Sequence, residues 1–168
     1  MEGMPEPLEA FYAKKRVYIP KVDTLSELRE RGFGSLEKGR LVLSPYEVFY
    51  LVEKGRIKVS QGNTAMTLQD LVGRLSLGKP EIWIKYLVYR DLRDRGYIVR
   101  ESREADFEVH GKGALRRLVS IVYEGLDAKL SDLSRSMKVA LEERKEFILA
   151  VVDRRTDIVF YSLSELSF

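Results

Sequence analysis

The 168-residue sequence contains no cysteine and only one histidine, His110. The absence of cysteine excludes disulfides, thiolate zinc sites and cysteine nucleophiles, and a single histidine excludes a metal site built mainly from imidazoles. Side-chain amides are scarce as well, with one asparagine and two glutamines. Scarce amides, no cysteine and 33% charged residues are typical of proteins from high-temperature organisms, so we expect a thermophilic source.

The sequence also lacks long apolar runs and an excess of one sign of charge. No apolar run approaches the ~18 residues of a membrane-spanning helix, and residues 1–15 show no signal-peptide pattern. We therefore expect a cytoplasmic protein without a membrane partner. Residues 1–77 carry 12 basic and 10 acidic groups, and residues 78–168 carry 17 and 16. With so even a balance, the charge neither requires nor excludes a nucleic-acid partner.

The clearest break in the sequence pattern lies at residues 75–83, where Gly78 and Pro80 interrupt the chain. A helical pattern ends before this break and a new one opens after it. We therefore expect two domains, residues 1–77 and residues 78–168, and the mixture of helix and strand patterns predicts an α/β (α+β layered) fold.

The pattern in the first domain predicts a small α/β unit. Ser44 as N-cap, Pro45 at the first helical position and Glu47 three residues after the cap form a capping box, and Gly55 is expected to end that helix. The other expected elements are a short helix from Thr24 or Ser26 to Gly32, strands at residues 40–43 and 56–59, and a helix at residues 67–76.

The second domain is expected to be nuclease-like, with a mixed five-stranded sheet and one helix on each side. Apolar residues at helical spacing from Ile82 to Leu92 indicate the first helix, which Gly96 ends. The second helix is expected to have Ser131 or Asp132 as its N-cap. The expected strands are residues 97–101, 106–110, 118–125, 146–153 and 157–166.

The stretch EADFEVHGKG, residues 104–113, contains the single histidine within an alternating pattern. In a strand this alternation places Asp106, Glu108 and His110 on one face and Ala105 with the other apolar residues on the opposite face. Two carboxylates and an imidazole could bind a metal ion or move protons, or they could form the solvated side of a half-buried strand. A magnesium nuclease of the restriction-enzyme type needs a lysine two residues after the second acid. His110 stands there instead.

Basic and aromatic residues offer further candidates for binding RNA. Lys145, where a helix meets a strand, could direct its ammonium group at a phosphate or could lie at an exposed junction. Arg116 and Arg117 flank a strand and could contact phosphate or form a charge pair that discourages edge aggregation. Five aromatic residues could stack on bases, but their helical spacing beside aliphatic residues favours the core: Tyr46, Phe49, Tyr50, Tyr86 and Tyr89.

Three stretches match segments of one known family. LSPYEVFYLVEKGRIKV (residues 43–59) is similar to L-S-x-x-E-A-x-Y-L-x-x-x-G-K-I-x-V. YLVYRDLRDRGYIVRESREADFEVH (residues 86–110) is similar to Y-x-V-Y-x-D-L-R-x-R-G-Y-x-V-K…A-D-F-R-V-Y. RKEFILAVVDRRTDIVFYSL (residues 144–163) is similar to R-K-x-L-L-x-A-V-V-D-x-x-G-D-I-x-Y-Y. Together they resemble the archaeal tRNA-splicing endonuclease family, and the resemblance covers most of the chain.

The resemblance implies RNA cleavage without a metal or cofactor, giving a 2′,3′-cyclic phosphate and a 5′-hydroxyl. In the family a tyrosine is the general base, a histidine the general acid, and a lysine stabilises the phosphorane. His110 stands at the tyrosine position and Lys145 at the lysine position. Residues 114–125 contain no histidine, and Leu115 or Arg116 lies nearest to its place. Because one of three catalytic residues is retained, the resemblance implies a non-catalytic, structural subunit.

The resemblance also implies an α₂β₂ heterotetramer with a catalytic subunit of the same family. The C-terminal stretch, residues 157–168, is apolar and suited to pairing with another subunit by strand addition, and the expected contacts there are Phe160, Tyr161 and Leu163. Family members carry acidic residues in the loop before the final strand, and in this chain Asp153 and Asp157 occupy that loop. These five residues are the expected assembly residues.

The implied substrate is a precursor tRNA with a bulge–helix–bulge motif. In the family two arginines hold a bulge base, and Lys138 lies near the position of one of them. Lysine lacks the planar guanidinium group that stacks well. Lys138, Arg116 and Arg117 are therefore candidate RNA contacts rather than a complete clamp.

Two other interpretations stay open. The chain could be a self-sufficient ribonuclease that uses His110 for proton transfer and Lys145 for charge stabilisation, since a histidine with a pKa near ~6.5 is a better base at neutral pH than a tyrosine. It would still lack the family's general acid. The chain could also be an RNA-binding or assembly module with no role in splicing.

Overall fold

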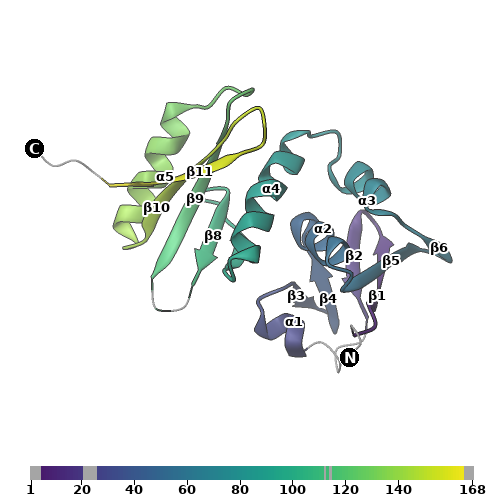
Figure 1. Cartoon of the computed structure of the whole chain (residues 1–168). Helices are drawn as coiled ribbons and strands as arrows, with labels where there is room; N and C mark the ends of the chain where they lie inside the picture. The colour runs from purple at the N-terminus through teal and green to yellow at the C-terminus, as the bar shows by residue number, and fades with distance from the viewer. Residues whose placement is uncertain (1–4, 21–25, 112, 114, 165–168) are drawn as a thin grey trace, which may run out of the picture. The chain divides into compact units, whose positions relative to one another are not determined.

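The computed structural model describes residues 5–20, 26–111, 113 and 115–164, which Figure 1 draws in colour. The chain divides into two compact units, Met1–Trp83 and Ile84–Phe168. This division falls at the end of the break in the sequence pattern at residues 75–83, a few residues after the predicted domain boundary between residues 77 and 78. Within the described residues, no helix is long and apolar enough to cross a membrane.

The N-terminal unit contains a six-stranded mixed sheet with the strand order β3-β4-β2-β1-β5-β6 (Figure 1). β1 is parallel to β5, and the other neighbouring strands are antiparallel. The elements are β1 (Leu8–Ala13), β2 (Arg16–Ile19), α1 (Ser26–Glu30), β3 (Ser35–Glu37), β4 (Arg40–Leu43), α2 (Pro45–Glu53), β5 (Ile57–Gln61), β6 (Thr64–Ala65) and α3 (Leu68–Leu75). The sequence patterns predict β4, β5 and the helices but miss the other four strands. Thr24, one of the two expected starts of α1, lies outside the described residues.

One face of the N-terminal sheet forms part of the core and the other is open. The register pairs Val17 with Leu43 and Ile19 with Leu41, and all four side chains are buried. Tyr18 lies between two of them in β2 and points to the opposite face, because side chains alternate along a strand.

The capping box predicted for α2 is present and has an additional role. The hydroxyl of Ser44 accepts the N–H of Glu47, and Oε1 of Glu47 accepts the N–H of Ser44. Oε2 of Glu47 accepts the N–H of Gly34, in the turn before β3. A Cβ atom on Gly34 would lie 2.7 Å from Cγ of Leu41, so the close approach that forms this turn requires glycine. The same carboxylate thus begins a helix and ties it to the turn.

The C-terminal unit contains a five-stranded sheet with the order β11-β10-β9-β8-β7 (Figure 1). β9 and β10 are parallel, and the other pairs are antiparallel, as expected for a mixed sheet. The elements are α4 (Glu81–Asp94), which begins within the N-terminal unit, β7 (Ile98–Glu101), β8 (Phe107–His110), β9 (Arg116–Tyr123), α5 (Leu130–Glu142), β10 (Glu146–Val152) and β11 (Ile158–Leu163).

Each face of this sheet is covered by one helix, which confirms the predicted layering. Tyr89 of α4 contacts Phe107 on one face, with ring centroids 5.8 Å apart. On the other face Ala140 of α5 forms a buried cluster with Leu118 and Phe147. Both cores are made by the alternating apolar residues of the strands.

The predicted N-cap of α5 is wrong. Lys129 is the N-cap residue, its backbone is extended, and it makes no side-chain cap hydrogen bond. The N–H of Asp132 donates to the Lys129 carbonyl, and the carboxylate of Asp132 pairs with Arg135 at 3.2 Å. Ser131 and Asp132 therefore lie inside the first turn, where a carboxylate is favoured by the helix dipole without acting as the cap.

Candidate functional site

The alternation predicted for residues 105–110 breaks at the start of β8. Oδ2 of Asp106 accepts the N–H of Ile121, and Oδ1 pairs with Lys85 of α4 at 2.8 Å. Ala105 packs against the cluster beneath α5 instead of joining Phe107 on the α4 side. The prediction that Asp106 shares a face with Glu108 and His110 is therefore wrong, because Asp106 is used to fasten the strand entry to α4 and β9.

Glu108, His110 and Lys145 come together on the face of the sheet that α5 covers. Lys145 directly precedes β10 and Glu108 lies in β8, with β9 between these strands. Nζ of Lys145 lies 3.0 Å from Oε1 of Glu108, and Nε2 of His110 lies 4.0 Å from the same oxygen. The carboxylate of Glu108 thus lies between the two residues that are predicted to match the family's catalytic positions.

Lys145 is held by a second carboxylate as well. Its Nζ lies 2.6 Å from Oε2 of Glu143, and the lysine side chain is only 16% exposed. Arg144, which lies between Glu143 and Lys145 in the sequence, has a positive φ of 57°. The N–H of Lys145 donates to the carbonyl of Ala140. This left-handed turn at the end of α5 directs the lysine inward. The carboxylates of Glu143 and Glu108 raise the pKa of Lys145 above its ordinary value.

Arg116 and Arg117 lie at the start of β9, with their side chains on opposite faces. Arg116 is paired in register with His110 and is exposed. The guanidinium of Arg117 lies over the Tyr97 ring and donates a 2.8 Å hydrogen bond to Glu146. The Ser162 hydroxyl and Arg117 together lower the pKa of Glu146, despite its partial burial. Arg116 is thus the arginine that faces the His110 side.

The predicted assembly residues lie in β11 and in the turn before it. β11 is an edge strand, and Tyr161 is 51% and Leu163 38% exposed, whereas Phe160 faces α4 and lies under Arg95. Oδ1 of Asp153 accepts the N–H groups of Arg155 and Asp157. Asp153 therefore shapes the turn, and the carboxylate of Asp157 is exposed.

The remaining candidates are separated from this cluster. Lys138 is exposed on α5. All five aromatic residues considered for stacking on bases are buried, which confirms their place in the core: Tyr46, Phe49, Tyr50, Tyr86 and Tyr89. Within the described part of the chain, no three histidine, cysteine or acidic side chains are grouped as metal ligands.

Comparisons with known proteins agree with this two-unit architecture. Residues 82–160 match the family model for the tRNA intron endonuclease catalytic C-terminal domain, and residues 7–72 match the model for the N-terminal domain of the same family. A tRNA-splicing endonuclease of Pyrococcus furiosus is 38% identical over 98% of this chain and 100% of its own length. A Thermococcus onnurineus tRNA-splicing endonuclease is 34% identical with the same coverage.

A third relative differs in length. The tRNA-splicing endonuclease of Methanococcoides burtonii is 33% identical over 93% of this chain, which spans only 46% of that relative. Two family models and full-length relatives above 30% identity define the family. The chain belongs to the tRNA intron endonuclease family, the archaeal tRNA-splicing endonucleases.

The sequence patterns do not reveal that Glu108 and Glu143 are the partners of Lys145. One signal was available in the family segment A-D-F-R-V-Y, where this chain has Glu108 at the position of the arginine. Such a change of charge sign beside a predicted catalytic position could have indicated a role for Glu108. Glu143 could be found only once the turn between α5 and β10 was known.

Proposed function

We propose that this chain is the structural subunit of a heterotetrameric tRNA-splicing endonuclease. A catalytic subunit of the same family would complete the α₂β₂ assembly and cut precursor tRNA at bulge–helix–bulge motifs without a metal, leaving 2′,3′-cyclic phosphate and 5′-hydroxyl ends. The observation that carries this proposal is the pairing of Lys145 with two carboxylates at 2.6 and 3.0 Å.

A lysine that stabilises a phosphorane must direct its positive charge at the phosphate. Here Glu108 and Glu143 together bring two negative charges to one ammonium group, so the positive charge of Lys145 is compensated and is less available to a phosphate. The low exposure of Lys145 strengthens this effect, because a partly buried pair is screened less by salt than an exposed one. Lys145 is therefore a structural ion-pair residue in this proposal.

The proton-transfer groups support the same proposal. The residue in register with His110 is Arg116, and a guanidinium stays protonated in proteins, so it cannot deliver a proton to a leaving group. His110 could accept a proton, but the general acid would still be missing. Loss of such a group typically costs ~10²–10⁴ in rate.

The edge strand β11 supports assembly with another subunit. Val159, Tyr161 and Leu163 point to the same face, because alternate residues share a side, and their side chains are 38–51% exposed. An edge strand with exposed apolar side chains is suited to pairing with a strand of another chain. The exposed carboxylate of Asp157 would add a contact for a basic partner surface.

The proposal is tested by mixing the purified chain with a catalytic family subunit from the same organism. Cleavage of an intron-containing precursor tRNA is measured in EDTA for each protein alone and for the mixture, and the mass of the mixture is determined by light scattering. We expect an inert chain that forms a tetramer with its partner and makes it active. Cleavage by this chain alone that His110→Ala abolishes would instead establish the self-sufficient ribonuclease. RNA binding without any effect on the partner would establish an RNA-binding module.

A further inference from the structure

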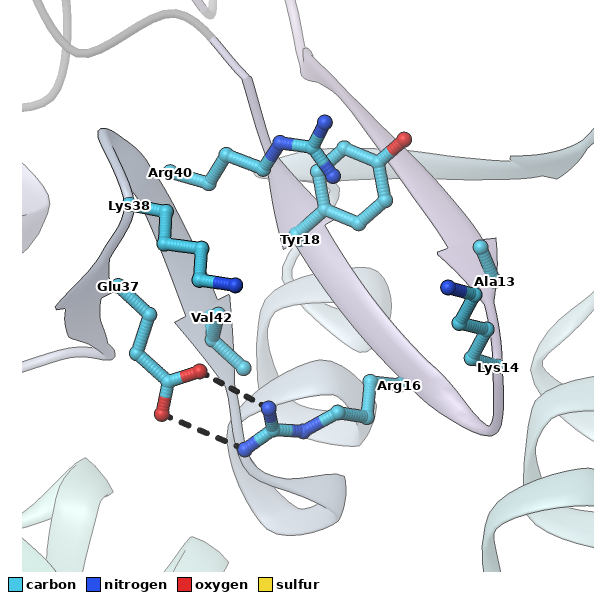
Figure 2. Close-up of a pocket in the computed structure, with 8 residues that line it drawn as sticks. All are labelled: Ala13, Lys14, Arg16, Tyr18, Glu37, Lys38, Arg40 and Val42. Atoms are coloured by element: carbon cyan, nitrogen blue, oxygen red, sulfur yellow. Dashed lines mark hydrogen bonds and ion pairs between the residues drawn. The ribbon is translucent and has the colours of Figure 1, made fainter.

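The open face of the N-terminal sheet contains a hollow of about 490 Å³. Figure 2 shows the side chains around it, which come from the hairpin of β1 and β2 and the hairpin of β3 and β4. The lining residues are Ala13, Lys14, Arg16, Tyr18, Glu37, Lys38, Arg40 and Val42. This face lies opposite the buried side chains of β2 and β4, so the core does not use it.

The hollow concentrates the positive charge of the protein. Four of its lining residues are basic and one is acidic, which gives a local excess of three positive charges. The whole chain has a formal net charge of +3, so the remaining charges balance. Within the described residues, Lys14, Lys38 and Arg40 form no ion pair. This local excess of positive charge would attract a polyanion.

Two guanidinium groups in the hollow are held in place before any ligand arrives. The guanidinium carbon of Arg40 lies 4.6 Å from the centroid of the Tyr18 ring. Figure 2 shows the Arg40 guanidinium against this ring. Arg16 donates two hydrogen bonds to the carboxylate of Glu37, at 2.8 and 3.4 Å. A planar guanidinium stacked on an aromatic ring still offers its outer face and its N–H edge, and both are used by proteins to hold RNA bases and phosphates.

The turns at the rim of the hollow carry lysines in an unfavourable conformation. Lys14 and Lys15 have positive φ angles of 50° and 63°, and Lys38 has a φ of 50° before Gly39 at 76°. Two-residue hairpin turns with positive φ angles usually contain asparagine and glycine, which adopt them at lower cost. Both hairpin turns nevertheless contain lysine, and Lys14 and Lys38 line the hollow. Backbone strain of this kind often accompanies binding sites.

We propose that this face binds a single-stranded segment of RNA. Lys14 and Lys38 contact phosphates, and one unpaired base stacks on the outer face of the Arg40 guanidinium, which Tyr18 supports from the other side. The inference rests on the proposed function in taking the precursor RNA as the ligand. It goes beyond that function in giving the N-terminal unit an RNA contact separate from the cluster around Lys145.

The test compares two double variants of the full chain that lose the same charge. Lys38→Gln/Arg40→Gln removes two groups of the hollow, and Arg29→Gln/Lys79→Gln removes two exposed groups of the same unit that lie outside it. Affinity for a fluorescent single-stranded RNA is measured as a function of salt. We expect the first variant to bind at least ~10-fold more weakly, with the salt slope smaller by ~0.7 for the one phosphate contact that is lost with Lys38. The second variant should stay within about twofold of the unmodified chain, since its groups touch no RNA.

Arg40→Lys separates stacking from charge. We expect this variant to lose ~5-fold or more in affinity while keeping its salt slope, because lysine retains the charge but not the planar group. Equal losses in the two double variants, or none in the first, would overturn the inference. Binding is measured without the catalytic partner and cleavage with it. If the first double variant keeps its RNA affinity while mixtures with the catalytic partner cleave the precursor, the inference alone is rejected. If that variant loses RNA affinity but the mixtures do not cleave, the proposed function alone is rejected.

Discussion

The two sheets of this chain differ in how their charged side chains are balanced. In the C-terminal sheet, helices cover both faces, and Lys145, which is predicted to match the family's catalytic lysine, is paired with Glu108 and Glu143. In the N-terminal sheet one face is open and carries basic residues that outnumber the acids. The difference teaches that a basic residue within a family motif need not offer a free positive charge, because neighbouring carboxylates decide whether that charge is available.

The first prediction concerns the carboxylate of Glu47, which connects α2 to the turn before β3. Glu47→Ala removes the hydrogen bonds to the N–H groups of Ser44 and Gly34 in a site only 5% exposed. We expect the free energy of unfolding to fall by about 2–3 kcal/mol, because buried donors lose a charged acceptor. Urea unfolding measures the loss. Asp70→Ala, which breaks the exposed capping box of α3, is the matched control and should cost less. Equal losses would contradict this account.

The second prediction concerns the strained turn between β1 and β2. Lys14→Asn/Lys15→Gly places residues suited to positive φ angles in this turn. We expect the protein to become more stable by ~1–2 kcal/mol, since left-handed backbone is unfavourable for lysine. RNA affinity should fall at the same time because the ammonium group of Lys14 is lost from the hollow. A thermal melt and an RNA titration on the same sample check both effects. A variant that is stabilised but binds RNA unchanged would remove Lys14 from the proposed contact.

The third prediction concerns the pH dependence of stability in the C-terminal unit. The pKa of Lys145 is raised above its ordinary value of 10.5, so the folded state holds this proton more tightly than the unfolded state. The ion pairs therefore contribute fully below pH 10.5 and are lost as pH rises through the folded pKa. In the unmodified protein, loss of this proton lowers the free energy of unfolding at alkaline pH by at most ~1.4 kcal/mol per pH unit. We expect Lys145→Met to remove this part of the alkaline loss. Identical alkaline slopes in urea unfolding of the two proteins would show that the carboxylates do not hold the charged lysine.

Much of the fold could be predicted from the sequence, because several elements carry local signals. The capping box at Ser44 and Glu47 and the alternating strands of the C-terminal sheet are examples. The hairpin of β1 and β2 escaped prediction because its turn consists of Lys14 and Lys15, which carry none of the usual turn chemistry. Its two strands border the basic hollow, so that hollow escaped prediction too.

The candidate site was predictable only in part. The positions of His110 and Lys145 follow from the family segments, but their environment depends on tertiary structure. The contact between Glu108 and Lys145 depends on the strand order, in which β8 and β10 are both neighbours of β9. The N-cap of α5 was misplaced because serine and aspartate at the helix start looked like caps, whereas Lys129 occupies that position without a side-chain bond.

The central claim is that the cluster around Lys145 stabilises this chain and does not cleave RNA. The most direct measurement is the single-turnover cleavage rate of the reconstituted mixture in EDTA, with His110→Ala and Lys145→Ala placed in this chain. A matched mixture carries alanine at the lysine position of the catalytic subunit. We expect the first mixture, once its assembly is verified, to cleave within about twofold of the unmodified mixture. The second should lose a factor of ~10² or more, as when a group that stabilises transition-state charge is removed. A comparable loss in the first mixture would mean that this chain takes part in catalysis.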